Sequence, residues 1–142
     1  MVEDSRIDLL HNVPLFSGLE RRDLRDVAST MKERRFAPGH VLAEEGQSGV
    51  GFFVIEEGEA KVEVGGREVR RLHPGDYFGE IALIADSPRT ATITAETPIL
   101  ALGLTSWEFR PIVETNASIA WKMLESLARM FGESQRAASG PQ

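Results

Sequence analysis

The sequence contains no cysteine among its 142 residues. This absence excludes disulfide bonds, cysteine nucleophiles, thiolate zinc sites and iron–sulfur clusters. No apolar run approaches the roughly 20 residues that a membrane-spanning helix needs. The polar, acidic start at residues 1–5 lacks the features of a secretory signal peptide. We therefore expect a cytoplasmic protein that makes no membrane contact.

Basic residues are also fewer than acidic residues. The chain has 16 Lys and Arg against 22 Asp and Glu, a net charge of −6, whereas a nucleic-acid surface needs a basic stripe. The three histidines, His11, His40 and His73, are too scattered for a metal site. We therefore expect no nucleic-acid partner, no metal and no cofactor. A hydrophobic content of 42% is enough for a single core, which favours one domain.

Glycine is concentrated in the middle of the chain, where nine of the 13 glycines lie between Gly39 and Gly79. The Gly65-Gly66 pair is typical of a two-residue hairpin turn. Short apolar or alternating segments, as expected for strands, occur at residues 41–44, 52–55, 60–64, 67–72, 89–96 and 99–104. This pattern predicts a β-barrel or β-roll over about residues 35–104.

Helical patterns precede and follow this region. A short helix is expected at residues 5–12. A capping box of Ser17 and Glu20 predicts a second helix, whose apolar face indicates an end near Arg34. The expected domain therefore begins with helices and continues into the strands.

A second capping box, Thr105 with Glu108, predicts a helix to about Asn116, and Ser118 can cap a last helix at 118–131. The C-terminal helices would thus cover about residues 105–131, which completes a single domain over residues 1–131. The eleven small and polar residues 132–142 are expected to form a disordered tail.

Residues 78–92 lie between two strands and do not alternate. The residues after Gly79 can form one helical turn whose backbone N–H groups suit an anion, and Gly79 allows close approach of a ligand. The isolated Arg89 suits a phosphate or a carboxylate, and Glu80 can accept from ribose hydroxyls. Together, the backbone N–H groups, Arg89 and Glu80 suit a sugar phosphate ester. An Arg89–Glu80 ion pair that only pins the loop is an equal alternative.

The pattern Gly-Glu-Ile-Ala-Leu at 79–83, followed by Pro-Arg-Thr-Ala-Thr at 88–92, resembles the phosphate-binding cassette of cyclic nucleotide-binding domains. This family includes catabolite-activator-like regulators and protein kinase A regulatory subunits. The match extends over about residues 10–131 and includes Pro38-Gly39, Glu45-Gly46, Phe52–Ile55, Gly58-Glu59, Leu72 and Pro74–Glu80. The resemblance implies a mainly β fold, an eight-stranded, jelly-roll-like β-roll (a double-stranded β-helix) with N-terminal and C-terminal helices.

The resemblance also implies a binding site. Arg89 would pair with the cyclic phosphate, which the backbone N–H groups of Ala82 and Thr90 would cap. Glu80 would accept from the ribose 2′-hydroxyl, the Thr90 side chain would reach the phosphate or the base, and a residue of the last helix would cover the base. The implied ligand-binding residues are Gly79, Glu80, Ile81, Ala82, Arg89, Thr90 and Ala91, with Val64, Leu72 and Phe78 as candidate base or ribose contacts.

The loop at 46–51 departs from the family pattern, in which Asp is frequent at the positions of Gln47 and Val50. This loop is not expected to hold the nucleotide. A hydroxyl residue directly after the cassette arginine favours cyclic GMP in some members, but bacterial cyclic AMP receptors carry one as well. We expect cyclic AMP in preference to cyclic GMP, because the short chain resembles bacterial proteins.

No nucleophile–base pair or paired acidic site stands out, so we expect a non-enzyme. The eleven residues after Phe131 are too few for a helix-turn-helix motif. Three functions remain. The first is a stand-alone sensor that acts through an unknown protein partner or its own dimer. The second is a regulatory fragment of a larger transcription factor, channel or enzyme. The third is a β-roll interaction module that has lost nucleotide binding.

The sensor hypothesis gives the last helix a role, because ligand at the cassette would shift the population of its conformations. Positions 120, 124, 127 and 131 of that helix resemble a short heptad seam. We expect this face to pack on the β-roll, and a homodimer through residues 118–131 is the alternative.

Overall fold

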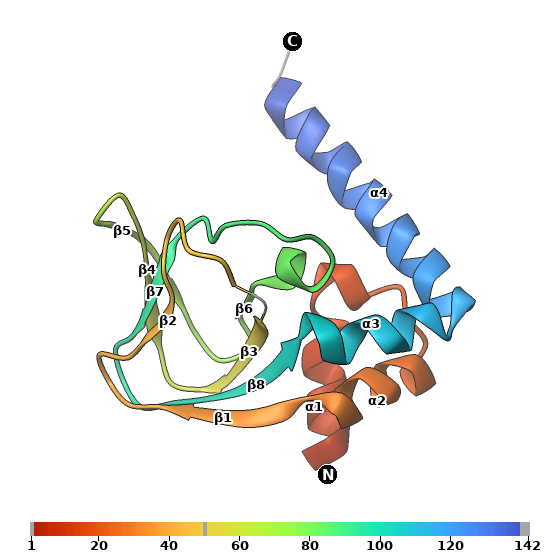
Figure 1. Ribbon diagram of the computed structural model, residues 1–142, viewed down its shortest axis with the longest axis horizontal. Helices are drawn as coiled ribbons and strands as arrows, with labels where there is room; N and C mark the ends of the chain where they lie inside the picture. The colour runs from red at the N-terminus through yellow and green to blue at the C-terminus, as the bar shows by residue number, and fades with distance from the viewer. Residues whose placement is uncertain (1, 50, 140–142) are drawn as a thin grey trace. The chain divides into compact units, whose positions relative to one another are not determined.

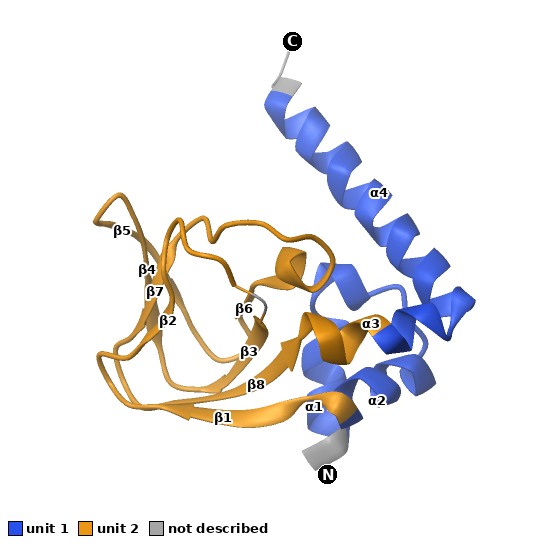
Figure 2. Cartoon of the chain, viewed as in Figure 1, with its two compact units in different colours: residues 1–29, 111–142 blue, residues 30–110 orange. Residues whose placement is uncertain are grey.

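The computed structural model describes residues 2–49 and 51–139 (Figure 1). The chain divides into two compact units (Figure 2): residues 30–110 form a central unit, and residues 1–29 with 111–142 form a terminal unit. All strands of the described residues belong to the central unit. The single domain expected over residues 1–131 stays a prediction.

The central unit holds two antiparallel sheets of four strands each within the described ranges. One sheet has the order β1-β8-β3-β6 and the other β2-β7-β4-β5. The eight strands are β1 (Lys32–Phe36), β2 (Val41–Ala43), β3 (Gly51–Glu57), β4 (Ala60–Val64), β5 (Arg67–Leu72), β6 (Tyr77–Phe78), β7 (Thr92–Ala95) and β8 (Ile99–Thr105). The predicted eight-stranded β-roll with flanking helices is confirmed.

Alternating side chains build the core of this unit. In β4, Ala60 and Val62 are buried while Lys61 between them is half-buried, because successive strand residues point to opposite faces. Gly65 and Gly66 join β4 to β5 with φ values of 61° and 79°, the left-handed geometry that a type I′ hairpin requires. Buried residues from both sheets meet in one cluster: Ala43, Ile55, Ala60, Val62, Leu72, Phe78, Ile93, Ala95, Ile99 and Ala101.

The first strand begins earlier than the sequence predicted. Helix α2 (Arg21–Thr30) ends at Thr30, and β1 starts at Lys32, so the expectations of helix up to Arg34 and of a roll from residue 35 are wrong. All five residues of β1 pair with β8, and four of its side chains are exposed. The strand lies at the edge of its sheet, where charged side chains are tolerated and hide the alternation that identifies inner strands.

The terminal unit contains α1 (Val2–His11), the 3-10 helix η1 (Pro14–Phe16), α2 and α4 (Ala117–Ser139); α3 (Ser106–Glu114) runs across the boundary between the units. Two expected caps are absent. The Ser17 hydroxyl donates to the Pro14 carbonyl at 2.9 Å, which closes η1 and does not cap α2. The Ile119 N–H donates to the Asn116 side-chain oxygen at 3.1 Å, so Asn116 caps α4 in place of Ser118.

Helix α4 continues to Ser139, well beyond Phe131. The expectation of a disordered tail is wrong for residues 132–139, and residues 140–142 lie outside the described residues. The segment is rich in the helix formers Ala, Glu, Gln and Arg, whose propensities offset the cost of about 1 kcal/mol at Gly132. In the described part of the chain, no helix has both the length and the apolarity to cross a membrane.

The predicted cap at the start of α3 is present in part. The Glu108 carboxylate accepts hydrogen bonds from the Thr105 backbone N–H at 3.0 Å and from the Thr105 hydroxyl at 2.8 Å. Lys32 Nζ lies 3.0 Å from the second carboxylate oxygen, but its exposure limits what that pair contributes. The Thr105 hydrogen bonds, aided by Lys32, hold the pKa of Glu108 below its ordinary value.

We expect Glu108→Ala to lower the free energy of unfolding by about 1 kcal/mol at neutral pH, the usual scale of a capping interaction. Because folding lowers the pKa of Glu108, its stabilisation is present above the unfolded pKa of about 4.3 and is lost as pH falls through the folded value. Urea unfolding of wild type and variant at decreasing pH measures this convergence. The exposed Glu125→Ala serves as control, and an undiminished difference in acid would contradict the charge mechanism.

Candidate functional site

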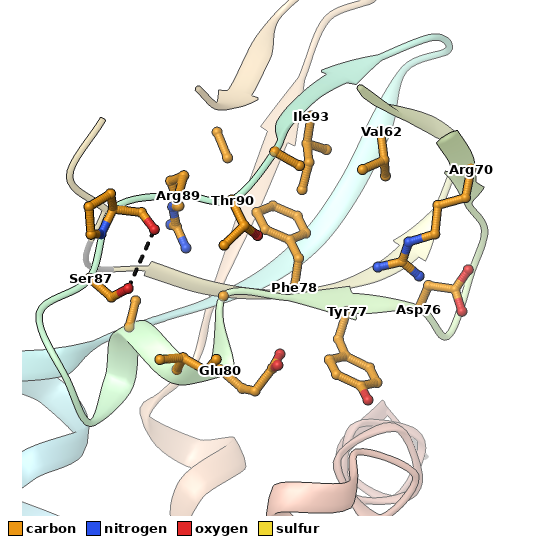
Figure 3. Close-up of a pocket in the computed structure, with 16 residues that line it drawn as sticks. Val62, Arg70, Asp76, Tyr77, Phe78, Glu80, Ser87, Arg89, Thr90 and Ile93 are labelled. Atoms are coloured by element: carbon orange, nitrogen blue, oxygen red, sulfur yellow. Dashed lines mark hydrogen bonds between the residues drawn. The ribbon is translucent and has the colours of Figure 1, made fainter. Parts of the chain in front are cut away.

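A cavity of about 440 Å³ opens in the central unit between the β-roll and the segment from Asp76 to Ala91 (Figure 3). Its size falls in the range of about 300–1,000 Å³ that is usual for small-molecule sites. Strands β2, β4, β5 and β7 supply part of the wall. The lining residues are Ala43, Val62, Arg70, Asp76, Tyr77, Phe78, Gly79, Glu80, Ile81, Ala82, Ser87, Pro88, Arg89, Thr90, Ala91 and Ile93.

Gly79 turns the chain from β6 into the 3-10 helix η2 (Glu80–Leu83). Its φ of 88° and the closeness of the Gly51 carbonyl oxygen leave no room for a Cβ, so only glycine fits. The single helical turn predicted here is therefore present. The Ala82 N–H, predicted to cap a phosphate, donates to the Gly79 carbonyl at 3.0 Å, so a phosphate would have to share that donor.

Arg89 lies before β7, since that strand begins at Thr92 and not at residue 89 as predicted. Its guanidinium Nη2 donates to the Gly51 carbonyl at 2.7 Å, and its Cζ lies 5.9 Å from the centre of the Phe78 ring. Arg89 and Glu80 are both described residues, and they form no ion pair within 4 Å. The alternative of an Arg89–Glu80 ion pair that pins the loop is therefore wrong.

The electrostatics of Arg89 follow from this geometry. Burial lowers the pKa of Arg89 from its ordinary value, and the negative charge of Glu80 acts in the opposite direction. The guanidinium keeps its charge at any physiological pH, because arginine titrates only in strong alkali. No carboxylate of the described residues forms an ion pair with this partly buried cation, so it attracts an anion into the cavity that it lines.

Glu80 and Tyr77 form the polar edge of the cavity, and Figure 3 shows the Glu80 carboxylate and the Tyr77 ring pointing to the same side of β6. Burial, followed by the charge of Glu80, raises the pKa of Tyr77, while Arg70 acts in the opposite direction. The Glu80 carboxylate is only partly exposed and is available to accept hydrogen bonds from a ligand hydroxyl.

Most of the predicted site residues are brought together here. Val64 and Leu72 are not: Leu72 is fully buried in the core, and Val64 is 43% exposed near the β4–β5 hairpin. Val62 lines the cavity instead, two residues earlier on the same face of β4. The residues that do line it as predicted are Phe78, Gly79, Glu80, Ile81, Ala82, Arg89, Thr90 and Ala91.

Sequence reasoning missed Arg70, Asp76 and Tyr77, which form the end of the cavity away from Arg89 (Figure 3). A signal for Arg70 was present. Because strand side chains alternate, Arg70 shares a face of β5 with the buried Leu72, and its exposed side chain reaches the cavity from that face. Arg70 pairs across the sheet with Val62, so the two side chains reach the cavity together.

The comparisons with known proteins bear on the family of the chain. The family model described as the cyclic nucleotide-binding domain matches residues 33–116, which include both sheets except Lys32 and all of the residues that line the cavity. The chain belongs to the cyclic nucleotide-binding domain family. The resemblance of the cassette at residues 79–92 to this family is thereby confirmed.

Two relatives illustrate the breadth of the cyclic nucleotide-binding domain family. A type II regulatory subunit of cAMP-dependent protein kinase from Drosophila melanogaster is 35% identical over 121 residues, 85% of this chain and 32% of its own. A cGMP-dependent protein kinase from Toxoplasma gondii is 41% identical over 87 residues, 61% of this chain and 9% of its own. The chain thus spans about a third or less of these relatives.

A solved structure matches over nearly its whole length. The N-terminal domain of a transcriptional regulator from Streptomyces coelicolor superposes with a TM-score of 0.84 at 30% sequence identity. The match covers 95% of this chain and 97% of that domain. The β-roll with its flanking helices is therefore the architecture of a cyclic nucleotide-binding domain.

Proposed function

We propose that this chain is a non-catalytic sensor that binds a 3′,5′-cyclic nucleotide in the cavity beside Arg89. The observation that carries the proposal is the charge of Arg89, which is partly buried and lacks a contact ion pair with Glu80. The cyclic phosphate would supply the missing negative charge. Its single charge and two exocyclic oxygens match the forked donors of a guanidinium.

The rest of the ligand fits the chemistry of the wall. The Glu80 carboxylate would accept from the ribose 2′-hydroxyl, with Gly79 allowing close approach, and Thr90 would reach the phosphate or the base. The purine would lie against the apolar residues Val62 and Ile93. Binding would shift the population of conformations of the C-terminal helix and so alter the surface offered to a protein partner.

We infer that cyclic AMP is preferred to cyclic GMP. Relatives named for cAMP dependence match 85% and 87% of the chain and relatives named for cGMP dependence match 61% and 94%, so coverage does not separate the two nucleotides. The inference rests on the short chain, which resembles bacterial proteins, among them the Streptomyces coelicolor domain that matches it over 95% of its length. The length of the relatives named for cAMP or cGMP dependence also favours a role as the regulatory part of a larger system, in which the effector lies outside the matched region.

Replacing Arg89 tests the proposed function. Removing one partner of a desolvated charge pair costs about 2–5 kcal/mol, so Arg89→Ala is expected to weaken cyclic nucleotide binding by roughly 30-fold to several thousandfold. Arg89→Lys is expected to weaken it as well, because the fork is lost. Calorimetric titration with cyclic AMP and with cyclic GMP measures both effects.

The exposed Arg67→Ala, on β5, is the matched control and is expected to bind as wild type. The ligand-free melting temperature should change little in all three variants. A wild-type chain that binds neither nucleotide, or an Arg89→Ala variant that binds as tightly as wild type, would leave the β-roll as an interaction module.

Arg70 favours cyclic GMP as a second candidate ligand. Guanine presents two neighbouring acceptors, O6 and N7, whereas adenine presents one acceptor beside an amino group. A guanidinium on the wall of the base-binding region therefore complements guanine better than adenine. Figure 3 shows Arg70 at the opposite side of the Phe78 ring from Arg89, as expected if one arginine faces the base and the other the phosphate.

We expect Arg70→Ala to separate the two ligands. If Arg70 binds guanine with both donors, the variant loses about 5- to 150-fold in affinity for cyclic GMP, equivalent to 1–3 kcal/mol, and little for cyclic AMP. Competition of both nucleotides against one fluorescent analogue gives the ratio of affinities in wild type and variant. An unchanged ratio would remove the case for cyclic GMP.

We also propose a homodimer through α4, with a seam that differs from the one predicted. Ala120 and Leu127 are only half-exposed, because they flank the face that buries Ile119 and Met123. The exposed apolar residues are Trp121, Leu124 and Phe131, at 64%, 56% and 66%. With Ala128 they follow a 3-4-3 spacing, which gives a second copy of the same helix a matching stripe.

Leu124→Glu is expected to convert the dimer to a monomer, because it places two like charges at the centre of the seam. Sedimentation velocity with and without cyclic nucleotide measures the molecular mass. Glu133→Lys, on the opposite face of α4, is the control. A wild-type chain that remains monomeric at high concentration would contradict the homodimer.

A further inference from the structure

The backbone between β2 and β3 is bound to the backbone around Arg89. The Gly46 N–H donates to the Arg89 carbonyl at 2.8 Å, and the Arg89 N–H donates to the Gln47 carbonyl at 2.9 Å. Ser48 pairs with Pro88 as an isolated antiparallel bridge. These contacts fix the position of the Arg89 backbone relative to residues 46–49 before any side chain is considered.

The guanidinium of Arg89 then lies directly on this backbone. Its Nη2 donates to the Gly51 carbonyl at 2.7 Å. A Cβ added at Gly49 would lie 2.7 Å from Nη2 and 2.5 Å from Cζ, and closer still to Nε. A Cβ at Gly79 would lie 2.6 Å from Nη1. The guanidinium therefore occupies the space that side chains at Gly49 and Gly79 would fill.

Gly49 and Gly79 differ in backbone conformation. Gly79 needs its left-handed φ of 88°, whereas Gly49 is not among the glycines of positive φ, so other residues can adopt its backbone conformation. All three of the nearest atoms to a Cβ at Gly49 belong to the Arg89 side chain. The chain therefore has a steric reason for glycine at 49, and that reason is the guanidinium.

The Gly51 carbonyl restricts the guanidinium without neutralising it. A guanidinium has five N–H donors in one plane, and the carbonyl accepts one of them. The hydrogen bond fixes the plane, while the other donors and the full charge remain for an anion. The carbonyl thus orients the guanidinium as a carboxylate could. Because the carbonyl is neutral, it leaves the positive charge of Arg89 available to the anion.

We propose that Gly49 is a positioning residue for the ligand: the absence of a side chain there allows the Arg89 guanidinium to rest on the loop backbone and present its remaining donors to the phosphate. This inference rests on the proposed function, because it concerns how the same cavity binds its anion. It adds Gly49, which is not among the described residues that line the cavity, to the residues that determine affinity.

A larger residue at 49 is expected to leave the fold intact. The atoms that it would displace are at the far end of a flexible side chain, which can rotate away at little cost in stability. The displaced guanidinium would no longer be oriented, and a misplacement of about 1 Å can reduce the effectiveness of a positioned group by about a hundredfold.

The test compares Gly49→Val with Ser48→Val, an exposed neighbour in the same loop. We expect Gly49→Val to weaken binding of the better of cyclic AMP and cyclic GMP by about 10- to 100-fold, with Gly49→Ala intermediate. Ser48→Val should bind as wild type. Ligand-free melting temperatures should agree among the variants, so that loss of affinity is not loss of fold.

A double-mutant cycle with Arg89→Lys distinguishes positioning from a general disturbance of the loop. Lysine has no fork to orient, so Gly49→Val should change affinity by less than about twofold in the Arg89→Lys background. Equal losses in both backgrounds, or wild-type affinity of Gly49→Val, would overturn the proposal. These outcomes require a wild-type chain that binds and is sensitive to Arg89→Ala, which the proposed function predicts separately.

A measurement without ligand makes the inference independent of that requirement. The Nε–H resonance of Arg89 in the nuclear magnetic resonance spectrum is expected to shift in Gly49→Val and to remain in place in Ser48→Val. A resonance unaffected by Gly49→Val would overturn the proposal even if the nucleotide binds. A shifted resonance in a chain that binds no nucleotide would contradict the proposed function but support the positioning of Arg89 by Gly49.

Discussion

The partly buried guanidinium of Arg89, which forms no ion pair with Glu80, is the constraint on which the cavity depends. Such a cation is tolerated only where its donors are partly satisfied and its charge can meet an anion. The Gly51 carbonyl meets the first need, and the open cavity meets the second. Gly79 and the turn that follows it complete the arrangement, since a side chain at that position would occupy the same space.

The two sheets hold this arrangement from both sides. Strand β6, which leads into Gly79, pairs with β3 of one sheet, while Arg89 leads into β7 of the other. Backbone hydrogen bonds at Gly46 and Gln47 then tie Arg89 to the chain between β2 and β3. The site is therefore set by backbone contacts within the central unit, and its side chains add chemistry to a frame that is already defined.

Sequence patterns predicted the parts of the fold that rest on local signals. Alternation identified β4, and the Gly65-Gly66 turn, which needs positive φ, predicted that the chain returns as β5. Strand β1 was missed because its pairing with β8 is decided by residues far away in the chain. Helix α4 was cut short because a small and polar composition describes an exposed helix as well as a disordered tail.

The cassette was predictable because several spaced residues must agree, and Phe78, Gly79, Glu80 and Arg89 do line one cavity. Its wall was not. Choosing Val62 over Val64 requires knowing where along β4 the cavity lies, and that follows from sheet packing. The contact of Arg89 with the Gly51 carbonyl joins residues 38 positions apart, so no local pattern could reveal it.

Because β5 lies at the outer edge of its sheet, the two ends of the cavity differ in how strongly the surrounding fold constrains them. Arg70 belongs to a strand with one neighbour, and its own side chain is exposed, so substitutions there disturb little of the core. In contrast, the backbone N–H and carbonyl of Arg89 are both hydrogen-bonded, to Gln47 and Gly46. For the nucleotide site that we propose, base preference would therefore be open to single substitutions at Arg70, whereas the phosphate-binding end would be set by the fold.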